Sequence, residues 1–170
     1  TVSGNVTLGS SVTWGTFTGP IIVAATATLT SNGKDIPYLR FLNTITVTLA
    51  DDWTVTENLY FPNSLITVTL NSNNIYVSGG TITQANGCTV NGTTTLHVTG
   101  TVNWTAGSNY ISNPIVINTA GTFTLSNNFN LSGNTITWIS GTMASSGSAT
   151  SLYGNVTFTG TGLSFNNITA

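Results

Sequence analysis

Apolar residues alternate with threonine along most of the 170-residue chain. Clear runs of this kind occur at 45–49, 66–70, 75–77, 96–98, 123–125, 136–138 and 156–158. A period of two residues is typical of a strand with one buried face, and no segment has the spacing of an amphipathic helix. Threonine suits the alternate positions because its β-branched side chain favours extended backbone and tolerates water. The pattern predicts an all-β protein.

Similar segments return along the chain. The segment TVTL at 46–49 recurs at 67–70, and GNVT at 4–7 recurs at 154–157. Clusters of Gly and Asn, such as those at 79–80, 86–87, 91–92 and 133–134, separate the strands with residues that permit sharp turns. Loose repeats of this length predict a single parallel β-solenoid domain over residues 1–170, with about six to eight coils of roughly 20–28 residues. A β-sandwich is the alternative, because it also has short strands separated by turns.

Charged residues are scarce and clustered. They make up 4% of the chain, with 2 Lys or Arg and 4 Asp or Glu, and the net charge is −2. This charge provides no field that would attract nucleic acid, and no apolar run approaches the ~20 residues of a membrane helix. We therefore expect neither nucleic-acid binding nor membrane insertion. The whole charged set lies between positions 34 and 57, overlaps an irregular loop predicted around 31–40, and is a candidate contact patch: Lys34, Asp35, Arg40, Asp51, Asp52 and Glu57.

Residues for acid–base or metal chemistry are few. Asp51 and Asp52 are adjacent, so in a strand they would point to opposite faces, and they could converge only on a turn. His97 is the only histidine, lies between Leu96 and Val98, and is expected to point away from the core. Cys88 is the only cysteine and is expected to be a small buried residue. No phosphate loop, dinucleotide fingerprint or zinc spacing occurs, so we expect a protein without catalytic residues, cofactor or metal.

Aromatic residues admit two interpretations. Trp14, Trp53, Trp104 and Trp138 lie in strand-like segments beside Thr or Asn. They either fill the core and cap its ends or stack on sugars from an exposed face. The same alternatives apply to the tyrosines at positions 60, 76, 110 and 153.

The segments at 113–125, 132–138 and 163–169 resemble repeat segments of uncharacterised bacteriophage virion and tail-fibre proteins, with runs such as NPIVINTAGTFTL and SGNTITW. The likeness is one of composition and rhythm and covers about the last two-thirds of the chain. It implies a solenoid or fibre module, often trimeric, and it assigns no catalytic residue.

These observations favour a non-enzymatic structural module of a virion fibre or extracellular appendage, which builds a fibre or attaches to a host surface. Such a module would be a homo-oligomer, a trimer or filament, with a cell-surface glycan as a candidate partner. An adhesin or filament subunit assembled by strand sharing is the first alternative, with 2–8 or 163–170 as the donated strand. An ice-binding solenoid, suggested by the Thr-X-Thr pairs, and a polysaccharide-degrading β-helix are lesser alternatives.

Overall fold

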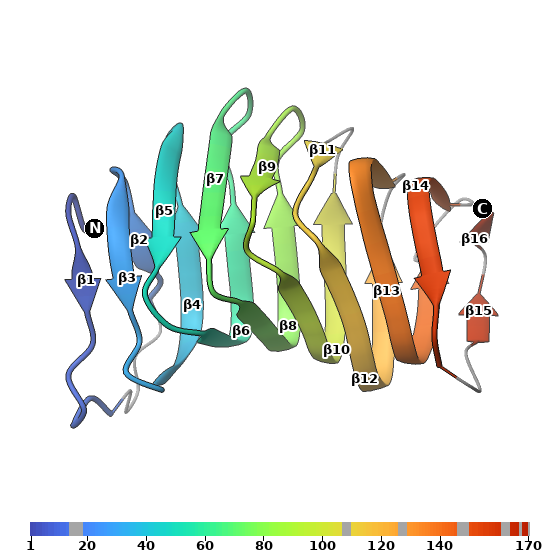
Figure 1. The fold of residues 1–170 in the computed structure, drawn as a ribbon, viewed down its shortest axis with the longest axis horizontal. Helices are drawn as coiled ribbons and strands as arrows, with labels where there is room; N and C mark the ends of the chain where they lie inside the picture. The colour runs from blue at the N-terminus through green and yellow to red at the C-terminus, as the bar shows by residue number, and fades with distance from the viewer. Residues whose placement is uncertain are drawn as a thin grey trace.

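The computed structural model describes residues 1–13, 19–106, 110–125, 129–145, 150–160, 164–166 and 168–169. Every strand pairing given for these residues is parallel. Figure 1 shows the coils stacked along the long axis, with the two chain ends at opposite ends of the stack. The fold is therefore the predicted parallel β-solenoid. A β-sandwich is excluded, because its sheets are antiparallel.

Neighbouring coils are separated by 18 to 23 residues of sequence. Ile21 pairs with Leu39, 18 positions later, and Val6 pairs with Leu29, 23 positions later. The other pairings fall between these limits. The longer of these spacings lie at the lower end of the predicted range of 20–28 residues, and the shortest fall just below it.

Each full coil has three strand-bearing faces. Face A is formed by separate, mostly short strands: β1 (Val6–Thr7), β3 (Ala27–Thr30), β5 (Ile45–Leu49), β7 (Thr67–Ser72), β9 (Thr89–Gly92), β11 (Tyr110–Ile111) and β16 (Ile168–Thr169). The first residues of β13 (Phe129–Ser145) and β14 (Thr150–Phe158) continue this row.

Faces B and C are formed mainly by long strands that bend at a corner. The bent strands are β4 (Asp35–Phe41), β6 (Trp53–Phe61), β8 (Ile75–Gln84), β10 (Leu96–Ala106) and β12 (Ile115–Leu125). Their first parts form face B and their last parts form face C, and the register shifts at each bend. Strand β13 continues through both faces, and the end of β14 lies on face B. Two short strands, β2 (Ile21–Val23) and β15 (Ser164–Asn166), lie on face C.

The core is the inside of the coil, filled by the inward-pointing residue of each alternating pair. On face C, Leu39, Leu59, Ile82 and Trp104 follow one another through successive coils, and all four are fully buried. Beside them the rings of Phe41 and Phe61 stack with centroids 5.4 Å apart. Apolar residues of successive coils therefore contact their equivalents, and this explains why the alternation persists along the whole chain.

The expected burial of Cys88 is confirmed, and burial raises the pKa of its thiol to about 11.

Asparagine side chains tie neighbouring coils together at the corners. The Nδ2 atoms of Asn43, Asn73 and Asn113 donate to backbone carbonyl oxygens of the preceding coil at 2.7, 2.8 and 2.9 Å. Asn32 makes the equivalent bond to the carbonyl of Leu8 at 2.5 Å. A backbone carbonyl at a corner has no partner within its own coil, so these bonds satisfy groups that a turn leaves unpaired. The abundance of Asn in the sequence thus has a structural role.

The irregular loop predicted around 31–40 is wrong for most of its length. Only the segment before Asp35 forms a turn, in which the amide of Lys34 donates to the carbonyl of Ser31 at 3.1 Å. The rest belongs to strand β4, with Ile36 buried on face B. Pro37 occupies the bend between faces B and C, where the register shifts and a ladder hydrogen bond is not required.

No helix in the ranges described above is long and apolar enough to cross a membrane.

Candidate functional site

The structure does not bring the six residues of the predicted charged patch together in one place. Asp51 and Asp52 lie at the corner between β5 and β6, with Lys34 in the adjacent turn. Arg40 lies on the outside of face C, and Glu57 lies at the bend of β6. Asp35, the sixth residue of the patch, begins β4 on face B and is exposed.

The acidic corner is a clamp between coils. The carboxylate of Asp51 accepts hydrogen bonds from the backbone amides of Ser31 at 2.7 Å and Asn32 at 2.6 Å. Asp52 Oδ1 accepts from the backbone amide of Asn74 at 2.8 Å and from its Nδ2 at 3.0 Å. The two carboxylates therefore bind the preceding and the following coil respectively. Both residues therefore have a structural role, and their place in a contact patch stays a prediction.

Replacing Asp51 with alanine is expected to lower the free energy of unfolding by about 2 kcal/mol. The substitution leaves two amides of the neighbouring turn without an acceptor, and hydrogen bonds to a charged group contribute more than neutral ones. Urea unfolding monitored by tryptophan fluorescence measures the change. Ser64→Ala, at an exposed loop position, is the control and should change the value by less than about 0.5 kcal/mol. Equal effects of the two substitutions would contradict the clamp.

The three tryptophans that the structure describes do not form a sugar-stacking surface. Trp53, Trp104 and Trp138 are each 0% exposed. Trp14 lies outside the described residues. A side chain without accessible surface offers no ring face to a ligand, so for these three the stacking interpretation is wrong and core filling is correct.

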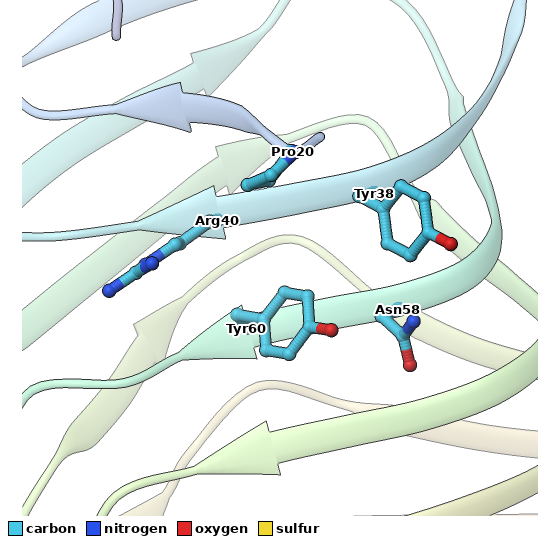
Figure 2. A pocket seen from close by; sticks show the side chains of 5 residues that line it. All are labelled: Pro20, Tyr38, Arg40, Asn58 and Tyr60. Atoms are coloured by element: carbon cyan, nitrogen blue, oxygen red, sulfur yellow. The ribbon is translucent and has the colours of Figure 1, made fainter. Parts of the chain in front are cut away.

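Two tyrosines instead line a pocket on the outside of face C. The pocket has a volume of about 460 Å³ and is lined by Pro20, Tyr38, Arg40, Asn58 and Tyr60. In Figure 2 the hydroxyl ends of both tyrosines lie near Asn58, while Arg40 extends in the opposite direction and Pro20 lies above it. The pocket therefore has a hydroxyl-rich end and a cationic end.

Strand alternation and register together create this pocket. Leu39 and its partner in β6 point inward, so the residues on either side of them point outward. The register places Tyr38 beside Asn58 and Arg40 beside Tyr60 on neighbouring strands. The two tyrosines are thus diagonal neighbours, a separation that aromatic side chains can span.

Hydrogen bonds orient the hydroxyl-rich end. The Tyr38 hydroxyl donates to Glu57 Oε2, and this bond, with partial desolvation and the nearby negative charge, raises the pKa of Tyr38. Asn58 Oδ1 accepts from the amide of Thr81 at 3.2 Å. At the other end, Arg40 Nε is buried and has no hydrogen-bond partner among the residues that the structure describes.

His97 lies outside this pocket, on face B. As expected, it points outward between two buried neighbours, and it stacks on Tyr76 with ring centroids 4.5 Å apart. Burial lowers the pKa of His97, and the charge of Asp52 opposes that shift.

The stability of the fold is expected to fall on mild acidification because of His97. Its folded pKa lies below the unfolded value of about 6.5, so the unfolded state takes up a proton first. The stability that neutral His97 contributes to the folded state is complete above pH 6.5, and it is lost as the pH falls towards the folded pKa. Urea unfolding at pH 7.5 and 5.5 should show this loss, and His97→Gln should reduce it. An unchanged pH dependence in the variant would exclude His97 as its source.

Sequence reasoning found only part of this pocket. Arg40 was included with the charged patch and Tyr60 among the ambiguous aromatics, whereas Tyr38 was assigned to a loop. The alternations Tyr38-Leu39-Arg40 and Asn58-Leu59-Tyr60 carried a usable signal, since each places two large polar side chains on one side of a strand.

The fold defines the class of the protein as a parallel β-solenoid, and the described residues form a mixed aromatic and cationic pocket on face C. Comparisons with protein-family models, curated proteins and solved structures give no match. Within the described part of the chain, no group of three or more His, Cys, Asp or Glu side chains is placed to hold a metal ion.

Proposed function

We propose that this protein is a non-enzymatic structural module of a virion fibre or other extracellular appendage, which contributes to a shaft and attaches it to a host surface. The observation that carries the proposal is the continuous parallel stack. Its inward rows are apolar and its outward rows consist largely of uncharged Thr, Ser and Asn. A rod stabilised by backbone ladders and apolar contacts depends little on ionic strength, which is compatible with exposure to varied surroundings.

The placement of the carboxylates supports a structural role over a polysaccharide-degrading one. Hydrolysis of a glycosidic bond uses two carboxyl groups that flank it. Asp51 and Asp52 instead accept bonds from backbone amides of different coils, and Glu57 accepts from Tyr38 near the face C pocket.

The pairing of the terminal segments favours a fibre module over a subunit that donates a strand. Strand β1 pairs with β3, and Val2 forms a bridge with Val23. At the other end β15 pairs with β13 and β16 with β14. Each described terminal strand thus completes the coil stack of its own chain.

An ice-binding face is the second candidate, because face A carries ladders of outward threonines. The ladders contain the stacked pairs Thr28–Thr48, Thr46–Thr69 and Thr67–Thr89. Stacked strands place such hydroxyls about 4.8 Å apart across the face and roughly 6.7 Å apart along a strand. Asparagine replaces threonine at Asn71 and Asn91, so the array is short. Thermal hysteresis of the purified protein is the measurement, and its absence would remove this candidate.

The test of the main proposal combines size, shape and attachment. Sedimentation analysis and negative-stain electron microscopy should show an elongated trimer or filament, and labelled protein should bind host cells saturably. A strict monomer that binds neither cells nor glycans would contradict the proposal.

A further inference from the structure

We propose that the pocket on face C binds one pyranose ring that carries a carboxylate, as part of an acidic surface glycan. This inference rests on the proposed attachment function and assigns its ligand and its site. The pocket lies on the outside of the rod, away from the acidic clamp, and its volume of about 460 Å³ falls within the range of small-molecule sites.

The aromatic part of the pocket fits a sugar ring. Tyr38 and Tyr60 are both half-buried, so each ring is held by its neighbours and still has accessible surface. The bond from Tyr38 to Glu57 fixes one of the two rings. Tyrosine offers an apolar face and a polar tip, which match the C–H face and the hydroxyl groups of a pyranose.

The polar groups divide the pocket in the way that an acidic sugar requires. Asn58 and the two phenol hydroxyls lie together at one end, where they can exchange hydrogen bonds with sugar hydroxyls. Arg40 supplies the only cation among the lining residues. A guanidinium binds a carboxylate through two parallel hydrogen bonds, so an acidic sugar would gain a charge-assisted pair at this end of the pocket.

Glu57 does not occupy the cationic end. Its carboxylate accepts the Tyr38 hydroxyl, which Figure 2 shows on the side of the pocket opposite the Arg40 guanidinium. Glu57 therefore does not pair with Arg40 at this end of the pocket. A neutral sugar would gain the ring contacts and the hydroxyl contacts, but it would lack the charge-assisted pair.

The experiment is calorimetric titration of the full chain with acidic oligosaccharides that contain glucuronic, galacturonic or sialic acid, beside neutral oligosaccharides of matched length. We expect at least one acidic glycan to bind at least tenfold more tightly than its neutral counterpart. Tyr60→Ala should weaken this binding about tenfold or more, and Arg40→Gln should abolish the preference for the acidic sugar. Tyr76→Ala is the matched control, since Tyr76 is also a half-buried outward tyrosine but lies on face B.

Circular dichroism and thermal unfolding of each variant separate loss of binding from loss of fold, and Tyr60→Phe provides a milder second variant that retains the ring. The inference is overturned if none of the acidic glycans binds, if neutral glycans bind equally well, or if the pocket variants bind as the unmodified protein does. Sedimentation of the same samples separates this result from the broader proposal. A fibre-forming or cell-binding protein that ignores acidic glycans would refute the ligand assignment alone.

Discussion

Replacing Trp104 with alanine is expected to lower the free energy of unfolding by about 4 kcal/mol. Trp104 is fully buried in face C, follows Ile82 and precedes Leu125 in the ladder, and contacts the ring of Phe123 edge-on at 6.1 Å. Removing a buried indole loses its transfer free energy and leaves a cavity, which neighbouring coils held by backbone ladders cannot close. Urea unfolding followed by circular dichroism measures the loss.

Two further variants test the cause of this effect. Trp104→Phe keeps a large ring and should cost clearly less than the alanine variant. Leu65→Ala removes an apolar side chain that is 89% exposed, and the change should stay within about 0.5 kcal/mol. A small effect of Trp104→Ala would mean that the stack does not depend on the filling of its interior.

Replacing Gly80 with alanine is expected to destabilise the protein by about 3 kcal/mol or more. Gly80 has a φ of 72°, and a Cβ atom there would lie 1.7 Å from the carbonyl oxygen of Glu57 in the preceding coil. The cost combines a left-handed backbone conformation with a clash against the backbone of the preceding coil, which cannot rotate away. The coils must separate locally to admit even one methyl group.

Gly33 provides a matched control for this prediction. Its φ of 70° is nearly the same, but a Cβ there would meet nothing within 4 Å. Gly33→Ala should therefore cost only the conformational penalty, about 1 kcal/mol. Chemical unfolding of both variants gives the difference, and equal losses would show that the close approach of the coils at Gly80 contributes nothing.

The alternation carried enough information to place most core residues without a structure. It also indicated the direction of two tryptophans. Trp53 shares its parity with Val55 and Trp138 shares its parity with Ile136, and all four are buried. The sugar-stacking hypothesis was based on the ability of tryptophan to stack on sugars and did not consider on which side of the strand each tryptophan lies. In a strand the side chain direction depends on parity alone, so parity was the better guide.

The segment around 31–40 was misassigned because its local sequence does not show how the chain bends. Asn32, Gly33 and Pro37 are turn residues, and the first two do form a turn. Pro37 is instead accommodated at the bend of a continuous strand, where the chain passes from face B to face C. A bend of this kind is created by stacking on other coils, and a local pattern cannot reveal it.

The sequence by itself determined the all-β class, the coil-like repeats, the side of the strand on which most residues lie and the sites of several corners. These properties depend on local periodicity and on the conformational range of Gly and Asn. The tertiary structure decided the register between coils, because the offset varies from 18 to 23 residues and each value brings different residues together. That register places Asp51 and Asp52 beside backbone amides of the neighbouring coils, so that they form the clamp. It also places Tyr38, Arg40 and Tyr60 around one pocket.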